Sequence, residues 1–508
     1  MTVIASGPAE QVGAQRDDRP MPHHRIAIVG AGFAGLGTAI RLQQAGIEDF
    51  VLFEKADEVG GTWQANTYPG CQCDVPSHLY SFSFALNPDW SRSFSTQPEI
   101  WEYLKRCARE HDLYRRVRFR TELLHAEWSE TQQHWKLETS QGPLTAEVLV
   151  SGMGLLCEPS LPAIEGLERF EGPCFHSARW DHSVDLSGKK VAVIGTGASS
   201  IQLVPKIQPD VSELHLFQRT PPWILPHPDR KITAVERWLY RRLPRAQRLM
   251  REAIYWSREA FLLPLFLHPL LCRPVEMVAR RHMRRQIADL QLREQLTPNY
   301  RIGCKRILLS DDYYPAIDAE NTQLVTSPIE RVTETGILTR DGVEHRLDAI
   351  VLSTGFRVTD VPYASMLRGR DGRSLSEAWE GSPKAHLGST VAGFPNLFLL
   401  LGPYTGLGHT SVVFMIECQI EYLLDCLTTM DRQRLEAIEP KADAQQAFLA
   451  EMKQKAKRTV WLSGGCASWY LDAEGAASAI WPGPTWRFRQ RLKRFDPSDY
   501  ILRPRTTR

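Results

Sequence analysis

Two similar glycine-rich segments constrain the fold of this 508-residue chain more than any other feature. In the first, RIAIVGAGFAGLGTAIRLQQAG, an apolar strand at residues 26–29 leads into Gly30, Gly32 and Gly35, and a helical pattern continues to residue 44. The spacing GxGxxG permits a tight turn, close approach of a pyrophosphate to the backbone and close packing of helix on strand. The next strand ends in Glu54, whose carboxylate can bind ribose hydroxyls. Together these features predict a dinucleotide-binding βαβ unit.

The second segment, KKVAVIGTGASSIQLVPKI, repeats this arrangement. Gly195 and Gly197 fill the first two glycine positions, and Ser200 fills the third. Thr196 and Ser199 lie in the same turn and are included among the expected nucleotide contacts. A small residue suffices at the third position, because it has only to let the helix approach the strand. The sequence therefore predicts an α/β fold with two Rossmann-like domains.

The two units differ where their second strands end. Glu54 stands there in the first unit, whereas Gln218 and Arg219 stand there in the second. A carboxylate repels a 2′-phosphate, and an arginine pairs with it through charge-assisted hydrogen bonds. We therefore expect FAD in the first unit and NADPH in the second. The alternative that Arg219 is an ordinary surface arginine stays open.

Composition and charge argue against several other classes of protein. The net charge of +2 disfavours nucleic acid as the main partner. The 10 cysteines contain no CxxC pair, so we expect no metal site and no disulfide framework. The start of the chain does not resemble a signal peptide, and the apolar run at residues 261–271 is shorter than the ~20 residues of a membrane span. These features predict a cytoplasmic protein without an integral membrane segment.

The segment FEGPCFHSARWD, between the two units, carries the most specific pattern in the chain. Phe170, Gly172, His176, Trp180 and Asp181 match every specified position of FxGxxxHxxxW followed by Pro or Asp. That pattern is the fingerprint of type I Baeyer–Villiger monooxygenases, which belong to the class B flavoprotein monooxygenases. The chain resembles this family over nearly its whole length after residue 22. Relatives that oxidise nitrogen or sulfur carry Lys or Arg after the aromatic residue, so the resemblance favours the Baeyer–Villiger branch.

Two further motifs resemble the same family and assign site residues by that resemblance. In GGTWQANTYPGCQCD, Thr62 and Trp63 are expected along the flavin and Asp74 in the active site. In GCKRILL, Lys305 is expected at the 2′-phosphate of NADPH and Arg306 at the reacting atoms. Simpler interpretations stay open, since an isolated Asp is often a turn residue and Arg306 could belong to a structural ion pair.

A third motif, CASWY, resembles the C-terminal Ser-Trp-Tyr of the family and places Trp469 against NADP. An aromatic residue in the core or at an interface is the alternative for Trp469. His176 of the fingerprint is interpreted as a junction residue that couples domain rotation to turnover. A merely packed histidine is its alternative.

The positions of the motifs predict the domain organisation. We expect a disordered lead-in at residues 1–21 and a discontinuous FAD-binding domain at residues 22–150 and 384–508. The NADPH-binding domain is expected at residues 151–229 and 301–383, and a helical insertion at residues 230–300.

The insertion has helical periodicity, with Val235, Trp238, Leu239 and Leu243 on one face. It is also rich in arginine, for example at positions 280, 281, 284 and 285. We interpret these arginines as a solvated face, with weak contact to an anionic membrane surface as the alternative.

The resemblance implies an FAD- and NADPH-dependent enzyme that inserts one oxygen atom from O₂ beside a ketone carbonyl, through a C4a-peroxyflavin, to give an ester or lactone. Arg306 would stabilise the anionic peroxide and the developing oxyanion, and Asp74 would orient Arg306. We expect lipophilic ketones rather than keto acids, because the sequence shows no second fixed cation near Arg306. Residues 261–271 could form a lipophilic wall of the site or an ordinary packing core. An enzyme that oxidises nitrogen or sulfur, and a flavin-binding redox sensor without turnover, stay open as alternatives.

Overall fold

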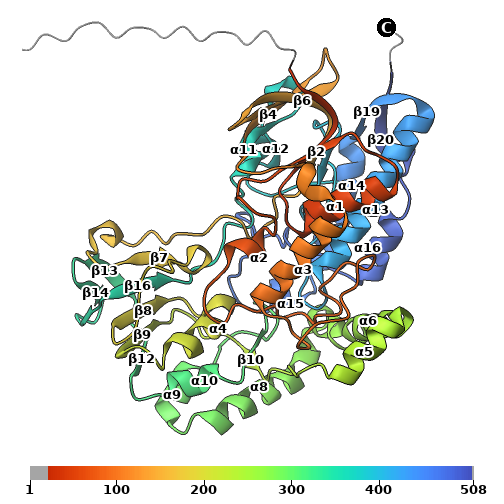
Figure 1. Ribbon diagram of the computed structural model, residues 1–508. Helices are drawn as coiled ribbons and strands as arrows, with labels where there is room; N and C mark the ends of the chain where they lie inside the picture. Colours follow the sequence, from red (N-terminus) through yellow and green to blue (C-terminus); the bar gives the residue numbers. More distant parts are fainter. Residues whose placement is uncertain (1–20, 506–508) are drawn as a thin grey trace, which may run out of the picture.

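The structure of the chain is a computed structural model that describes residues 21–505 (Figure 1). The expected lead-in therefore lies almost wholly outside the described residues. Two sheets with parallel strands occupy separate parts of the molecule, one at the upper centre of Figure 1 and one at the left. A group of helices forms the lower edge of the same view. The α/β fold class and the two Rossmann-like units are confirmed.

The first sheet has, within the described residues, eight strands in the order β17-β4-β5-β6-β1-β2-β3, with β18 paired to β6. β1 is parallel to β2 and β6, whereas β4, β5 and β6 pair with one another as antiparallel neighbours. The strands are β1 (His23–Val29), β2 (Phe50–Phe53), β3 (Val117–Arg118), β4 (Leu123–Ser129), β5 (His134–Thr139), β6 (Gly142–Ser151), β17 (Leu367–Arg368) and β18 (Leu397–Leu399).

The turn from β1 into helix α1 (Phe33–Gln44) explains its glycines. Gly30 has a φ of +97°, and a Cβ added at Gly35 would lie 1.8 Å from the carbonyl oxygen of Gly30. The helix thus lies so close to the strand that only glycine fits at both positions. β1 begins at His23, before the apolar run at residues 26–29, because its first residues are polar although their backbone is already extended. α1 begins at Phe33, inside the glycine-rich turn.

The second sheet has, in the described chain, five parallel strands in the order β12-β9-β8-β16-β7. Helix α4 (Ala198–Ile207) follows β8 as α1 follows β1. Ser200 takes the place of the third glycine, where its buried hydroxyl donates a 2.6 Å hydrogen bond to the carbonyl of Gly195. The strands are β7 (Cys174–His176), β8 (Lys190–Ile194), β9 (Glu213–Phe217), β12 (Thr322–Val325) and β16 (Ala349–Leu352).

The chain passes between the two sheets twice, and the two crossing segments pair with each other. Ser160 donates its N–H to Gly355, and Arg357 donates its N–H to Glu158. After the second crossing, β17 pairs with β4 of the first sheet, well before the expected boundary at residue 384. This pairing favours an earlier start of the second part of the FAD-binding domain, and we propose a boundary near residue 357. The sequence gives little signal for β17, because the strand is only two residues long.

The insertion at residues 230–300 consists of helices, and it forms the lower edge of Figure 1. No single helix within residues 21–505 is both long and apolar enough to cross a membrane. The segments Pro244–Leu267 and Pro269–Gln286 meet that criterion only when taken together, and a bend of 109° separates them. The insertion contains α5 (Ala234–Arg242), α6 (Pro244–Phe261), α7 (Leu263–Leu267), η4 (Pro269–Leu271), α8 (Cys272–Gln286) and α9 (Leu290–Gln295).

The C-terminal part of the chain returns to the first sheet. Helix α13 packs against α1, and most of its inward-facing side chains belong to the largest hydrophobic core cluster. The elements after the second crossing are α11 (Tyr363–Met366), α12 (Leu375–Trp379), α13 (Val412–Gln433), β19 (Leu435–Pro440), α14 (Ala442–Ala456), α15 (Val460–Ser463), α16 (Thr485–Leu492) and β20 (Tyr500–Pro504).

Candidate active site

Asp74 and Arg306 form a two-point ion pair where the two parts of the molecule meet. Nε of Arg306 donates to Oδ2 of Asp74 at 2.7 Å, and Nη2 donates to Oδ1 at 2.6 Å. Nη1 donates to the carbonyl of Leu407 at 3.1 Å. Since a guanidinium has five N–H groups, one on Nη1 and one on Nη2 remain for the nearby Tyr470 hydroxyl and for a bound molecule. The structure thus brings together the two residues that the sequence assigned to the chemistry.

Burial and charge act in opposite directions on this pair. Burial disfavours both ions, but the neighbouring carboxylate raises the pKa of Arg306 above its usual value. Burial likewise favours the neutral form of Asp74, yet the charge of Arg306 holds the pKa of Asp74 below its usual value. Both side chains keep about a quarter of their surface exposed, 27% for Arg306 and 28% for Asp74. The pair is therefore charged at neutral pH and open to a ligand.

A second arginine, Arg258 of α6, lies close enough to act electrostatically on Asp74 and Arg306. Nη1 of Arg258 donates to the carbonyl of His409 at 3.2 Å, two residues beyond the carbonyl that Arg306 holds. Burial, together with repulsion from Arg306, lowers the pKa of Arg258 to about 10. The expectation that no second cation lies near Arg306 is wrong, because α6 folds back over the site from a distant part of the sequence.

A buried apolar cluster packs close to this group of charges. Phe266 of α7 contacts the position that a Cβ would take at Gly303 and at Gly408, and its ring stacks on Trp461 at 5.6 Å. Tyr470 is fully buried, and its hydroxyl interacts with the Arg306 guanidinium. Burial raises the pKa of Tyr470 to about 12, so the hydroxyl stays protonated. Phe266 belongs to the run 261–271 and is 2% exposed, so it packs as core, and a role of the run as a wall of the site stays a prediction.

The first glycine turn fits the pyrophosphate and ribose of a dinucleotide. No side chain caps the N-terminus of α1, so its first N–H groups are free for an anion. Glu54 is buried, and its two carboxylate oxygens accept the N–H groups of Ala31 and Ala56 at 2.8 and 2.9 Å. Each oxygen keeps a lone pair for a ribose hydroxyl. Trp63 is buried against Tyr80, and Thr62 beside it is exposed.

The second glycine turn fits a nucleotide with a 2′-phosphate. No side chain caps α4, and a Cβ added at Gly197 would meet nothing within 4 Å. Arg219 is exposed at the end of β9, and its charge helps to lower the pKa of Lys305, after the larger effect of burial. Because the charge of Arg219 acts on Lys305, the two cations lie near each other. Such a pair is suited to a dianionic phosphate.

A disulfide joins the segment that holds Lys305 and Arg306 to the segment that holds Trp469. Cys304 and Cys466 are bonded across 162 residues of sequence. The expectation that the cysteines form no disulfide is wrong, because the two thiols meet only through the fold. Trp469 keeps 43% of its surface exposed and packs edge-to-face on Tyr470, with a ring separation of 4.3 Å. The remaining eight cysteines are free.

The fingerprint segment lies at the paired crossings. The His176 ring is buried, accepts the N–H of Ala178 at Nδ1 and lies 5.9 Å from the ring of Phe356 in the second crossing. Burial lowers the pKa of His176, so the ring is neutral at neutral pH. Trp180 contacts Phe175 edge-to-face within the same segment. His176 is thus packed where a domain rotation would act, and its coupling role stays a prediction.

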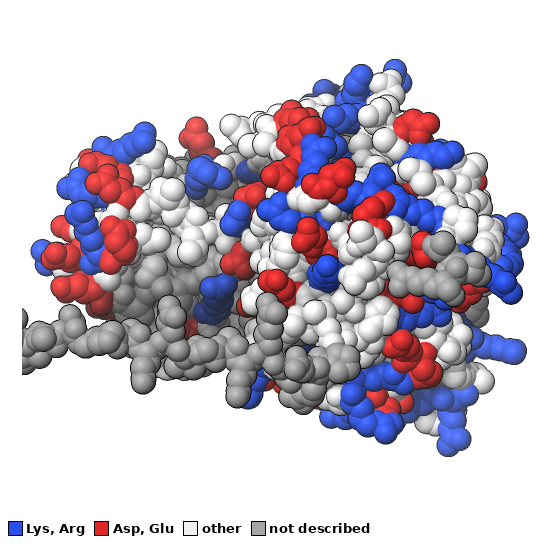
Figure 2. All heavy atoms as spheres, turned by 90° about the horizontal axis from the view of Figure 1, so that it is seen from above, with Lys and Arg blue, Asp and Glu red and all other residues white. Residues whose placement is uncertain are grey.

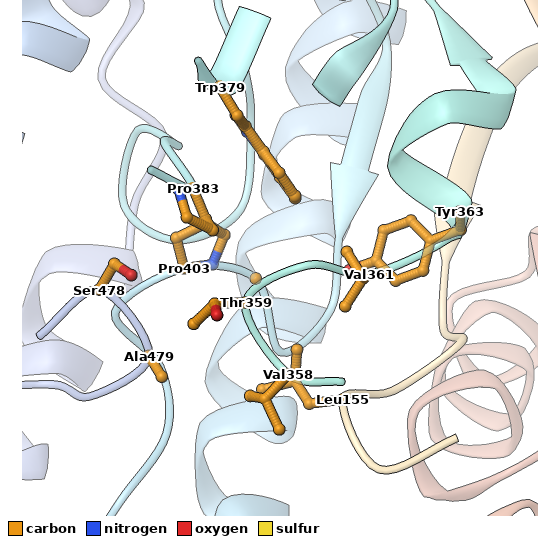
Figure 3. Close-up of a pocket in the computed structure, with 11 residues that line it drawn as sticks. Leu155, Val358, Thr359, Val361, Tyr363, Trp379, Pro383, Pro403, Ser478 and Ala479 are labelled. Carbon is orange, nitrogen blue, oxygen red and sulfur yellow. The ribbon is translucent and has the colours of Figure 1, made fainter. Parts of the chain in front are cut away.

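Figure 3 shows a small cavity behind the same crossings, with a volume of about 20 Å³. Its lining includes Leu155 of the first crossing, Val358 and Val361 of the second, and Ser478 and Ala479 of the C-terminal segment. Neither Asp74 nor Arg306 lines it. A space of this size holds about one water molecule, so it is a packing defect at the junction and not the substrate site.

Comparisons with known proteins agree with this geometry. Residues 23–366 match the family model described as flavin-binding monooxygenase-like. A Baeyer–Villiger monooxygenase of Pseudomonas aeruginosa is 50% identical over 94% of this chain and 92% of its own length. A Baeyer–Villiger monooxygenase of Streptomyces coelicolor is 49% identical over 95% and 93%. Among solved structures, the closed form of cyclohexanone monooxygenase superimposes with a TM-score of 0.86 at 27% identity, covering 96% of this chain and all of that one.

The chain belongs to the flavin-binding monooxygenase-like family, and within it to the type I Baeyer–Villiger monooxygenases. It is an NADPH-dependent flavoprotein monooxygenase whose cofactors are FAD and NADPH. A steroid monooxygenase bound to NADP, with 30% identity and a TM-score of 0.84 over 95% of this chain, shares its fold.

Proposed function

We propose that Asp74 and Arg306 form the catalytic centre of this Baeyer–Villiger monooxygenase and that its substrates are uncharged, lipophilic ketones. The observation that carries the proposal is the two-point ion pair at a partly open site, which leaves Arg306 with N–H groups that Asp74 does not occupy. The apolar cluster around Phe266, packed against Gly303 and Gly408 near the pair, supports the substrate class.

Bound FAD, reduced by NADPH, would supply the electrons that activate O₂, so that one oxygen atom of O₂ enters the ketone and the other leaves as water. The free N–H groups of Arg306 would hold the negative charge that develops on the carbonyl oxygen of the ketone. Asp74 fixes the plane of the guanidinium, so the donors point at the reacting atoms without reorganisation. Arg258 adds a second positive charge to the same region.

We also propose roles for the residues around the nucleotides. The turn at Gly30, Gly32 and Gly35 would hold the FAD pyrophosphate and Glu54 its ribose, with Thr62 and Trp63 beside the flavin ring. The turn that contains Gly195, Thr196, Gly197, Ser199 and Ser200 would hold the NADPH pyrophosphate. Arg219 and Lys305 would bind its 2′-phosphate, and Trp469 would contact the bound NADP.

Arg258 favours a second candidate substrate class, ketones that carry a carboxylate. Asp74 already makes its two-point pair with Arg306, and Arg258 has no salt bridge within residues 21–505. A carboxylate could therefore pair with it. We place uncharged ketones first because the reaction itself develops negative charge, which Arg258 can stabilise without a substrate anion.

The deciding experiment compares kcat/KM for a medium-chain methyl ketone, an aryl methyl ketone and a keto acid of equal size, in the wild type and in Arg258→Met. Under the proposal the wild type prefers the uncharged ketones. A wild-type preference for the keto acid that disappears in Arg258→Met would establish the second candidate in its place.

The number of free cysteines indicates the compartment in which the enzyme is found. We propose the cytoplasm, because eight of the 10 cysteines are free and only Cys304 and Cys466 are bonded. That one disulfide argues in the opposite direction. Fractionation of the host cell with a cytoplasmic and a secreted marker tests the proposal.

A further inference from the structure

The helical insertion exposes an unusual amount of apolar surface. Twelve of the 20 large apolar side chains that are exposed in the described chain lie between residues 235 and 290. The most exposed include Val235 at 74%, Leu249 at 71%, Phe261 at 74% and Leu270 at 78%. Trp256 is 52% exposed. Single exposed apolar residues are ordinary, but a group confined to one insertion indicates a surface that contacts something.

In helix α6, exposed apolar residues lie on one face of the helix. Leu249, Ala253, Trp256 and Ala260 are spaced by four, three and four residues, so they share one face of the helix, and all four are exposed. The buried face is spaced by four and is mostly polar: it consists of Gln247, Arg251, Tyr255 and Glu259. We call the exposed side of α5, α6 and the turn before α8 the apolar outer face.

The buried face of α6 is fastened to the rest of the molecule by hydrogen bonds. Nη1 of Arg251 donates to the carbonyls of His78, Leu79 and Ser81, at 2.8 to 3.1 Å. The carboxylate of Glu259 accepts the N–H of Thr485 at 3.1 Å. Turning α6 over would break these buried contacts, so the helix presents its apolar outer face outward and does not insert across a bilayer.

The same insertion carries an excess of positive charge. Residues 230–300 contain 15 Lys and Arg and six Asp and Glu, a net charge of +9 in a chain whose net charge is +2. The exposed Arg281, Arg284 and Arg285 lie on α8. On the face shown in Figure 2, which looks down from above the view of Figure 1, blue and red side chains are interspersed. The insertion, at the lower edge of Figure 1, thus differs in charge from the rest of the chain.

We propose that the apolar outer face docks on the surface of a bilayer that contains anionic lipids. Exposed apolar side chains with basic residues around them are the composition of helices that lie in the headgroup region. A second copy of the chain is the less suitable occupant, because two surfaces of net positive charge repel each other. The 109° bend between the two helical segments suits a structure lying along the surface and not one crossing it.

Docking would also connect the lipid to the active site. α6 carries Leu249 and Trp256 on its outer face, and it places Arg258 against the carbonyl of His409 beside Asp74 and Arg306. One helix therefore borders the bilayer on one side and the candidate site on the other. A ketone dissolved in the bilayer would be delivered next to the site that oxidises it.

The test is co-sedimentation of the purified FAD-loaded enzyme with vesicles of phosphatidylcholine alone and with vesicles that also contain phosphatidylglycerol, at low and high salt. The wild type is expected to bind the anionic vesicles and to be released by salt. The double variant Leu249→Ser/Trp256→Ser should lose most of the binding. Arg281→Gln/Arg284→Gln/Arg285→Gln should lower the partition coefficient about fivefold for each charge removed.

Leu124→Ser/Leu161→Ser is the matched control, because both leucines are exposed, at 51% and 66%, outside the insertion. It should bind vesicles as the wild type does. All variants must oxidise NADPH at the wild-type rate, which shows that they are folded. Absence of wild-type binding to anionic vesicles would overturn the proposal, as would equal loss in the control. A dimer in light scattering that Leu249→Ser/Trp256→Ser converts to a monomer would assign the face to a second copy instead.

Discussion

Asp74 and Arg306 are far apart in the sequence, yet two of their atom pairs lie at 2.6 and 2.7 Å. Asp74 comes from the loop after α2 (Thr62–Ala65), in the FAD-binding part, and Arg306 comes directly after the helical insertion. The pair therefore depends on how these two parts meet, and it connects the flavin side of the site to the NADPH side.

Arg306→Ala should lower kcat for ester formation by a factor of about 10² to 10³ or more, because it removes a fixed donor for the developing oxyanion. FAD should stay bound, since no FAD contact is assigned to Arg306. Product analysis by gas chromatography and the visible flavin spectrum measure the two effects. Arg331→Ala, at an exposed ion pair with Glu330, is the control. Unaltered ketone oxidation in Arg306→Ala would show that the catalytic donor lies elsewhere.

Replacing both Arg219 and Lys305 with Ala should abolish the preference for NADPH over NADH. Each charge-assisted contact to the 2′-phosphate contributes roughly 1.5–3 kcal/mol, or about tenfold or more in discrimination. The ratio of kcat/KM for the two coenzymes measures the effect, and the single variants should each lose part of it. A double variant that still strongly prefers NADPH would exclude both residues from the recognition of the phosphate.

Cys466→Ser should free the segment that carries Trp469 from the segment that carries Lys305. Loss of a disulfide across 162 residues should cost about 2–4 kcal/mol of stability, and KM for NADPH should rise with kcat little changed. Thermal unfolding with and without a reductant measures the first effect, because the reduced wild type should match the variant. Cys157→Ser, at an exposed free cysteine, should change neither quantity. A wild type insensitive to reductant would show that the bond is not formed.

The parts of the molecule that the sequence predicts well are those determined by local chemistry. The turns at Gly30 and Gly195 are predictable because each requires a positive φ and close packing within a few residues. Glu54 and Arg219 follow because the strand before each residue fixes its position. Asp74 and Arg306 could be named only through the resemblance to the family, since nothing in either motif alone brings them together.

The features that the sequence did not predict all depend on contacts between distant segments. The charge of Arg258 acts on Asp74 because α6 packs across the FAD-binding part. The helical pattern of α6 does not indicate that Asp74 lies nearby. Cys304 meets Cys466 for the same reason. The one available signal for Arg258 was its place beside Glu259, since Gln247, Arg251, Tyr255 and Glu259 recur every four residues, as on the packed polar face of a helix.

We expect His78 to make the attachment of the insertion dependent on pH. It is 7% exposed, its ring lies 5.0 Å from that of Tyr240 in α5, and its Nδ1 lies 3.2 Å from the side-chain nitrogen of Gln247 in α6. Burial, with a smaller effect from Arg230 and Arg251, lowers the pKa of His78 to about 4. The folded protein therefore keeps this ring neutral where an unfolded chain would protonate it.

As the pH falls from about 6.5 to about 4, the unfolded chain takes up a proton at His78 that the folded protein does not, so stability falls by roughly 3 kcal/mol. Above about 6.5 the ring is neutral in both states and contributes no pH dependence. Burial lowers the pKa of His176, His227 and His386 as well, and these residues add in the same direction.

His78→Gln should remove part of the acid sensitivity, and hydrogen exchange should locate the change in α5 and α6. His268→Gln, at an exposed position in the same insertion, is the control. If His78→Gln and the wild type lost equal stability between pH 7.5 and pH 5, the acid sensitivity would lie in the other buried histidines and the attachment of the insertion would not depend on this ring.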